Sequence, residues 1–269
     1  VGSEMCIRDR KIGDAPADFQ RLAPSFTVSL QPWQEQLLFL RLMYKSTFRM
    51  PTFNDLYYYR LGNRSLRPEK ANEYNMGITW SRSFSSFLNY LSVTVDGYYN
   101  DVTDKIVAFP TTYAWKMANY GKVHVTGMDA TLAAAASLGK NMVLVVSGGY
   151  TWQKAIDLTD ATSKSYKDQL PYTPKHSGNV SAVLEMPWVN VGYSIVGVSE
   201  RYSMSQNIPE NRIDGYMEHT ASLSRNFSFR HCKLRLQAEI INMTDTQYDV
   251  IKYYPMPGRS WRLTGTIEF

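Results

Sequence analysis

The chain has 269 residues, of which 44% are hydrophobic and 20% charged, with a formal net charge of +5. No stretch approaches the roughly 20 apolar residues that a membrane-spanning helix needs. No run of Lys and Arg could follow a phosphate backbone, so we expect no nucleic-acid partner. The two cysteines, Cys6 and Cys232, are too far apart in the sequence to indicate a metal site or a disulfide framework.

Aromatic residues make up 13% of the chain, including 19 Tyr, 11 Phe and 6 Trp. Membrane β-barrels place such residues in girdles at the two membrane interfaces. An aromatic-rich soluble β-sandwich would have the same composition. Composition alone therefore leaves both classes open.

The first ten residues, from Val1 to Arg10, contain no apolar core of signal-peptide length. They resemble translated sequencing-adaptor sequence. We therefore expect residues 1–10, Cys6 included, to be non-native, and residues 11–269 to be part of one domain of a longer protein.

The dominant hydrophobic period in the rest of the chain is two. In the segment 88–101, for example, Leu91, Val93 and Val95 alternate with polar residues. Apolar residues in a helix would instead recur at intervals of three and four. This alternation predicts about eleven strands. Their expected ranges are 23–33, 37–47, 70–81, 88–101, 120–138, 141–156, 174–187, 189–203, 214–226, 232–243 and 258–269.

The connections between these strands alternate strictly in length. Short links follow every odd-numbered strand, whereas the long links cover residues 48–69, 102–119, 157–173, 204–213 and 244–257. This alternation is typical of an up-and-down transmembrane barrel with tight periplasmic turns and long outer loops. A β-sandwich has no reason to alternate loop length in this way. The sequence therefore predicts an all-β, antiparallel, transmembrane β-barrel.

Strand direction and strand number both lead to a further expectation. If the last strand ends in the periplasm, the first strand runs downward and must follow at least one earlier strand. An odd count of eleven also conflicts with the even counts of single-chain bacterial barrels. We expect the C-terminal half of a barrel of about 22 strands, a size typical of plugged transporters, with the plug absent from this chain. Such a piece should form a curved open sheet.

Two motifs near opposite ends of the chain carry a family resemblance. The first runs from Phe48 to Gly77 and the second from Asn242 to Trp261. The first motif contains Arg49, Pro51, Phe53, Gly62, Asn63, Pro68, Glu69, Glu73 and Gly77. The second contains Asn242, Asp245, Tyr248, Gly258 and Arg259. Met243 and Thr244 depart from the leucine and phenylalanine usual in that motif.

Both motifs resemble those of TonB-dependent outer-membrane receptors, in the right order and framing nearly the whole chain. We expect structural roles for these residues, with the glycines allowing tight backbone conformations and the prolines fixing bends. The alternating last strand, from Trp261 to Phe269, resembles the C-terminal signal read by the outer-membrane barrel-assembly machinery. The resemblance places the protein in the outer membrane of a Gram-negative bacterium, in contact with its lipid.

Aromatic and cationic residues gather in the long links and are candidates for ligand binding. They are Tyr57, Tyr58, Tyr59, Arg60, Tyr113, Trp115, Lys116, Tyr253 and Tyr254. Such side chains can stack on a chelate and pair with its negative charge. The alternative interpretation is that these tyrosines belong to the outer aromatic girdle.

The sequence indicates neither an enzyme nor a cofactor. Four histidines, His124, His176, His219 and His231, lack metal-ligand spacing. Three aspartates of one link, at 157, 160 and 168, could hold Ca²⁺, although ordinary solvation is the simpler interpretation. No phosphate loop, nucleophile elbow or zinc motif is present.

The resemblance implies active import, energised by a TonB complex that contacts a region upstream of this chain. The expected cargo is a ferric siderophore, with cobalamin or haem as alternatives within the family. A passive porin-like channel and a surface barrel, either an adhesin or an outer-membrane enzyme, remain competing hypotheses.

Overall fold

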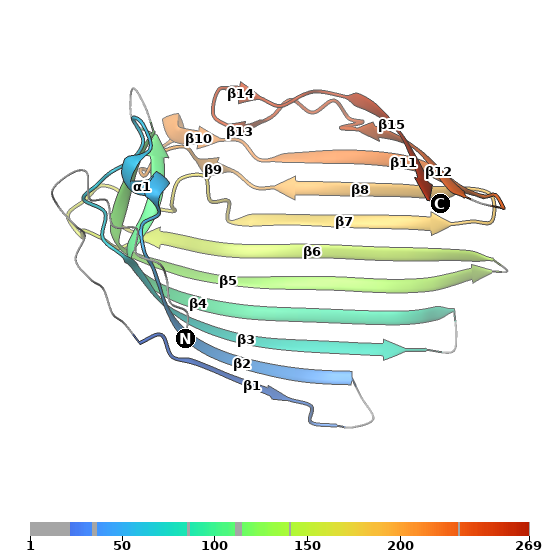
Figure 1. Cartoon of the computed structure of the whole chain (residues 1–269), viewed down its shortest axis with the longest axis horizontal. Coiled ribbons are helices and arrows are strands. Elements are labelled where there is room, and N and C mark those ends of the chain that lie inside the picture. Colours follow the sequence, from blue (N-terminus) through green and yellow to red (C-terminus); the bar gives the residue numbers. More distant parts are fainter. Residues whose placement is uncertain are drawn as a thin grey trace.

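The computed structural model describes residues 22–33, 37–84, 87–110, 115–139, 141–230 and 232–268. These residues form a single curved antiparallel sheet of eleven strands (Figure 1). The strands lie in chain order as β1 (Ser25–Leu30), β2 (Leu37–Arg49), β3 (Glu69–Ser83), β4 (Leu88–Pro110), β5 (Trp115–Gly139), β6 (Met142–Asp157), β7 (His176–Glu185), β8 (Asn190–Val198), β11 (Tyr216–Ser228), β12 (Lys233–Ile241) and β15 (Ser260–Glu268).

The predicted all-β, up-and-down architecture is confirmed. Each described strand pairs with its sequence neighbours in the sheet, and β1 and β15 each pair on one side within the described residues. Short turns lie at one end of the sheet and the long connections lie at the other (Figure 1). Residues 1–10, which we expect from the sequence to be non-native, lie outside the residues that the structure describes.

One predicted loop is wrong. Residues 102–119 were expected to form a long link, but β4 and β5 remain paired as far as Pro110 and Trp115. The apolar residues Ile106 and Val107 continue the strand, and Asp104 takes a positive φ of 54° where the pairing is interrupted. The two strands therefore project beyond their neighbours as a long hairpin.

The other long connections contain short elements of their own. The β2–β3 connection contains the helix α1 (Phe53–Tyr57), and the β8–β11 connection contains β9 (Arg201–Tyr202), the 3-10 helix η1 (Pro209–Asn211) and β10 (Arg212–Ile213). The β12–β15 connection contains β13 (Asp249–Ile251) and β14 (Tyr254–Pro255). None of the described helices is long and apolar enough to cross a membrane.

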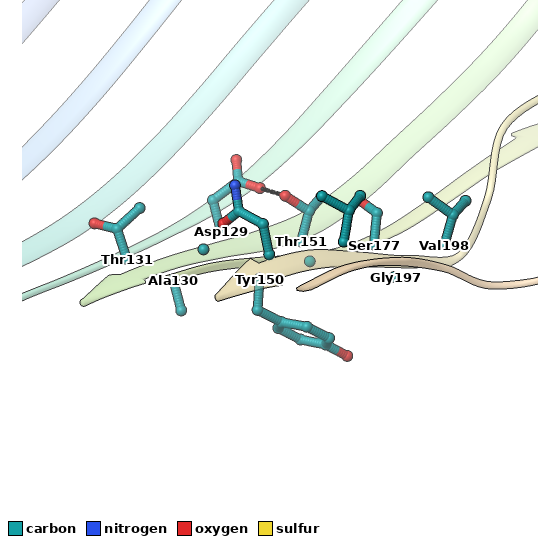
Figure 2. Close-up of a pocket in the computed structure, with 12 residues that line it drawn as sticks. Asp129, Ala130, Thr131, Tyr150, Thr151, Ser177, Gly197 and Val198 are labelled. Atoms are coloured by element: carbon teal, nitrogen blue, oxygen red, sulfur yellow. Dashed lines mark hydrogen bonds between the residues drawn. The ribbon is translucent and has the colours of Figure 1, made fainter. Parts of the chain in front are cut away.

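The two faces of the sheet differ in chemistry because side chains alternate along every strand. The convex face carries apolar rows, such as Leu42, Met76 and Leu132. The concave face carries polar groups, including Asp129, Thr151 and Ser177, whereas Tyr150 projects to the opposite side (Figure 2). This is the arrangement of a barrel wall with lipid outside and a polar lumen inside.

The best-buried cluster lies on the concave face near the long connections. It comprises Val102, Val123, Val125, Ala155 and Leu170. Four of these come from β4, β5 and β6, and Leu170 comes from the connection that follows β6. The core therefore forms where a long connection folds inward over the sheet.

Candidate functional site

The candidate site is the set of long connections at one end of the sheet. In the first of them, Thr52 caps α1 by accepting a hydrogen bond from the Asp55 amide at 3.2 Å. The Asp55 carboxylate accepts one from the Thr52 amide at 2.9 Å, which completes a capping box. Arg49 lies 3.2 Å from Asp55 and 3.5 Å from Glu69, so it links the helix to the start of β3.

The glycine–asparagine pair of this connection makes two close contacts. A Cβ added to Gly62 would lie 2.7 Å from backbone atoms of Leu56 and Tyr57, so no larger residue fits there. The Asn63 amide donates to the Met117 carbonyl of β5 at 3.0 Å. The connection is thereby fastened to the projecting β4–β5 hairpin.

The remaining residues of the first motif stabilise β3 and its neighbours. Pro68 precedes the first residue of β3, and Glu69 accepts a hydrogen bond from the Ile106 amide at 3.0 Å. Glu73 accepts one from Thr47 at 3.1 Å. Gly77 leaves room for an ion pair on the concave face, because an added Cβ would lie 1.9 Å from the Asp96 carboxylate that pairs with Arg41 at 2.9 Å.

The second motif forms a compact turn between β12 and β15. Asn242 is almost completely buried and takes a φ of 50°, and its side chain exchanges two 2.9 Å hydrogen bonds with the Thr246 backbone. Asp245 accepts a hydrogen bond from the Arg259 amide at 2.8 Å. An added Cβ on Gly258 would approach that carboxylate to 2.5 Å. Neither Gly258 nor Gly62 has a positive φ; both are sites of close approach.

Tyr248 of the same motif points to the concave face. Its hydroxyl donates to Glu218 of β11 at 2.5 Å, and its ring stacks on Tyr216 at 3.9 Å. Burial and the adjacent Glu218 carboxylate both raise the pKa of the Tyr248 hydroxyl. A neutral hydroxyl therefore anchors the last long connection to the lumen side of the sheet.

The connection between β6 and β7 folds over the concave face. Buried Gln169 accepts a hydrogen bond from the Ala155 amide at 3.2 Å and donates to the Gln153 and Thr173 carbonyls. The next long connection is joined to it, because Asn207 and Asp168 hydrogen bond at 3.0 Å. Successive outer connections thus form one hydrogen-bonded layer.

Tyr172 lies where three of these connections meet. Its ring contacts Trp115 at 5.8 Å, its amide donates to the Tyr202 carbonyl at 2.7 Å, and its hydroxyl interacts with the Lys252 backbone. Burial raises the pKa of the Tyr172 hydroxyl, opposed by the Lys252 hydrogen bond and nearby Arg201. Tyr172 therefore links two parts of the chain that contain ligand-binding candidates: Trp115 on one side, and Lys252, which precedes Tyr253 and Tyr254, on the other.

Arg201 is a buried cation in the same layer, with 4% of its surface exposed. It donates to the Asp249 and Val250 carbonyls at 2.6 and 2.9 Å and lies 5.8 Å from the Tyr216 ring centroid. It has no carboxylate partner within the described residues, and its Nη1 has no hydrogen-bond partner there. Arg201 and Tyr172 were not among the predicted candidates, since no motif surrounds either of them: Arg201 begins β9, and Tyr172 lies in the connection between β6 and β7.

The other predicted ligand candidates lie on the outer surface in two places. Tyr58 and Tyr59 follow α1 and are 59% and 78% exposed. Tyr253 precedes β14 and Tyr254 begins it, and they are 82% and 70% exposed. Tyr57 is half-buried and contacts Phe53 at 5.0 Å, and Lys116 is exposed beside Trp115. Tyr113 lies outside the described residues.

Cations lie over aromatic rings throughout the long connections. The pairs are Arg60 with Tyr59, Arg64 with Tyr57, Lys167 with Tyr166, Arg201 with Tyr216 and Lys252 with Tyr253, at 5.2 to 5.8 Å. None of these five cations forms a salt bridge to a carboxylate in the described part of the chain. Arg201 is buried, and the other four cations therefore offer accessible positive charge next to flat aromatic surface.

Several acidic groups of the same region are paired within the protein. Asp55 pairs with Arg49, Asp104 pairs with Arg67, and Asp160 accepts two hydrogen bonds from Thr162 that lower its pKa. No cluster of three or more His, Cys, Asp or Glu side chains suited to a metal ion occurs among the described residues.

An open groove of about 510 Å³, lined by both polar and apolar residues, lies below this layer on the concave face (Figure 2). Asp129 accepts a 2.6 Å hydrogen bond from Thr151 there, and residues of β7 and β8, such as Ser177 and Val198, complete the lining. In a closed barrel this surface borders the lumen. The groove therefore extends from the layer of long connections toward the interior of the barrel.

The convex face carries aromatic residues that fit a membrane interface. Tyr44, Tyr74 and Tyr99 form a row on adjacent strands, with ring centroids 5.1 and 6.2 Å apart. Trp261, predicted as part of the assembly signal, is 75% exposed on the convex side of β15, and Phe269 lies outside the described residues. This row, rather than the candidate loop tyrosines, occupies the position of an outer girdle.

The curved sheet, its apolar outer face and its long loops at one end define the wall of an outer-membrane β-barrel. The protein-family model described as "TonB dependent receptor-like, beta-barrel" matches residues 8–243. The chain therefore belongs to the TonB-dependent receptor family, as its two motifs predict, and forms part of the barrel of an outer-membrane protein.

Two relatives of the chain are both named as vitamin B12 transporters. The chain is 25% identical over 230 residues to "Vitamin B12 transporter BtuB" of Photobacterium profundum and 26% identical over 231 residues to that of Vibrio vulnificus, covering 82% of this chain in each case. It covers 34% and 33% of those proteins, so it spans about a third of their length.

Solved structures show the same fold. The ferric citrate transporter FecA matches with a TM-score of 0.70 at 16% identity, covering 90% of this chain and 37% of FecA. The siderophore receptor PiuA from Acinetobacter baumannii matches at 0.67 and 19%, covering 91% and 35%. The copper transporter OprC matches at 0.66 and 15%, covering 90% and 38%.

Proposed function

We propose that the protein containing this chain imports an anionic ferric chelate of the siderophore class across the outer membrane, energised by TonB. The observation that carries this proposal is a set of four exposed or partly exposed cation–aromatic pairs in the long connections, whose cations lack carboxylate partners in the described residues. The cations are Arg60, Arg64, Lys167 and Lys252. Guanidinium and ammonium groups attract the negative charge of such a chelate, and the rings stack on its aromatic or conjugated parts.

Family membership supports the transport mechanism. A barrel wall of this kind surrounds a lumen, and the concave groove beneath the loops gives the ligand a path inward past Asp129 and Thr151. In this proposal, the loops capture the chelate, and a plug and a TonB-contacting segment outside this chain couple its release to the inner membrane.

Cobalamin is the second candidate cargo. The observation that favours it is sequence similarity to two vitamin B12 transporters over 82% of this chain. Cobalamin would use the exposed tyrosines of the two loop groups for stacking and would depend less on the cations. The two cargoes would therefore depend on different residues of the same surface, the chelate on the cations and cobalamin on the exposed tyrosines.

The decisive experiment is growth of a strain lacking the full-length gene on single iron sources and on cobalamin as a required nutrient. The ferric-chelate proposal predicts a defect on one siderophore only, which disappears when the gene is restored. A defect confined to cobalamin would replace it with the second candidate. Growth equal to that of the parent on every source would contradict both.

Binding by the purified full-length receptor tests the site itself. R60A, R64A and K252A should each weaken chelate binding about two- to fivefold, since exposed cation–aromatic interactions contribute about 0.5–1 kcal/mol. R225A and R230A remove the same charge at the opposite end of β11 and should leave affinity unchanged. Removing TonB should abolish uptake while leaving binding intact.

A further inference from the structure

A group of basic residues on the convex face lies outside the ligand site described above. Lys70 of β3 and Lys122 of β5 are both paired with Thr103 of β4, so they lie on the same face two strands apart. Two strand spacings correspond to about 10 Å. His124 is two residues further along β5, on the same face as Lys122.

Lys154 of β6 extends this group. It is opposite Thr126 of β5, which in turn is opposite Tyr99 of β4. Lys154 therefore lies in the same row as Tyr99 and Tyr74, diagonally adjacent to His124. Lys122 and Lys154 are exposed, and Lys70 and His124 are partly exposed.

The three lysines form no salt bridge or side-chain hydrogen bond in the described part of the chain. One acidic residue faces the same area, namely Asp101 of β4. Its carboxylate lies 3.2 Å from the His124 ring, and no lysine lies within salt-bridge distance of it. The three lysines are therefore a concentration of positive charge without a paired carboxylate, whereas His124 has Asp101 beside it.

The row formed by Tyr44, Tyr74 and Tyr99 indicates the depth of this group in the membrane. On the side toward the short turns, the convex positions next to Tyr44, Tyr74 and Tyr99 are apolar, as at Leu42 and Met76. On the side toward the long connections they become polar. Such a change across a row of tyrosines marks the boundary between hydrocarbon and headgroups.

Lysines at this boundary meet the headgroups of the outer leaflet. A cation on the lipid face costs about 2–4 kcal/mol at the bilayer midplane but about 0–1 kcal/mol near the interface, so this position tolerates the three charges. Unpaired cations of this kind are attracted to lipid phosphate, and each contributes about fivefold to membrane affinity.

We propose that Lys70, Lys122 and Lys154, with His124 between them, bind the phosphate groups of a lipid of the outer leaflet. Tyr74 and Tyr99 support the adjoining sugar or acyl region of that lipid. The site is on the outside of the barrel and is independent of the cargo.

The test uses the purified full-length receptor in neutral detergent, titrated with diphosphorylated lipid A or with lipid A from which both phosphates have been removed. Native mass spectrometry measures the bound fraction. The wild-type receptor should prefer the phosphorylated form. The variant K70Q/K122Q/K154Q should lose affinity for it by on the order of 100-fold and should no longer discriminate between the two lipids.

The control variant R225Q/R230Q/K233Q removes the same charge at the short-turn end, away from both the lysine group and the candidate ligand site, and it should bind lipid A like wild type. Circular dichroism and cargo binding, measured on both variants, should match wild type. Equal binding of phosphorylated lipid by wild type and K70Q/K122Q/K154Q would overturn the proposal, as would equal binding of both lipids by wild type.

Discussion

The convex and concave faces of this sheet are built from the same strands but are stabilised in different ways. On the convex face, Leu132 and its neighbours are exposed in the isolated sheet and lose contact with water only through lipid. On the concave face, polar groups satisfy one another, as Arg41 and Asp96 do at 2.9 Å. The convex face is therefore stable only in contact with lipid, whereas the concave face is stabilised by hydrogen bonds and ion pairs among its own side chains.

The largest expected effect comes from placing a charge on the lipid face. Leu132→Arg in the full-length receptor should lower the free energy of unfolding in a bilayer by about 2–4 kcal/mol, because Leu132 lies well inside β5 among apolar neighbours. Thr131→Arg, on the lumen side of the same strand, is the matched control and should cost far less. Equal losses in denaturant titrations would mean that the faces have been assigned wrongly.

A smaller effect is expected from the concave anchor of the last connection. Tyr248→Phe removes the hydrogen bond to Glu218 and should cost about 1.5–3 kcal/mol, since hydrogen bonds to charged acceptors are the stronger ones. The stacked ring on Tyr216 stays in place. Urea unfolding of wild type and variant at neutral pH gives the difference.

The same tyrosine predicts a pH dependence. Its pKa is raised in the folded state above the ordinary value of 10.0, so folding favours the protonated hydroxyl. This stabilisation is complete below pH 10 and is lost as the pH rises through the folded-state value. Wild type should therefore lose more stability than Tyr248→Phe in alkaline unfolding series. Parallel curves would show that the hydroxyl does not titrate with folding.

The smallest effect separates two glycines on opposite faces. Gly77→Ala brings a Cβ to 1.9 Å from the Asp96 carboxylate and must displace the ion pair with Arg41, at a cost of about 1–2 kcal/mol. Gly97→Ala, on the convex face, meets nothing closer than 3.9 Å and should be nearly neutral. Thermal unfolding of both variants measures the difference in stability. A Gly77→Ala variant as stable as wild type would show that the Asp96 side chain can move aside without cost.

The candidate site was only partly accessible from the sequence. The motif residues Asn63 and Asn242 could be picked out because their neighbours match a known pattern, but their partners, Met117 and Thr246, could not be ranked by sequence alone. Arg201 and Tyr172 carry no local signal, because their importance comes from burial under loops distant in the sequence. The extension of β4 and β5 was missed where Asp104 interrupts the regular pairing.

The sequence by itself determined the strand period, the alternation of short and long connections, and the family, since these depend on neighbouring residues and on motifs of a few positions. Only the tertiary structure decided which connections fold over the concave face, how Trp115, Tyr172 and Lys252 come together, and that three lysines gather next to a row of tyrosines. The physical reason is that alternation fixes the face on which a side chain lies, whereas strand register and loop packing fix which residues from distant segments share it.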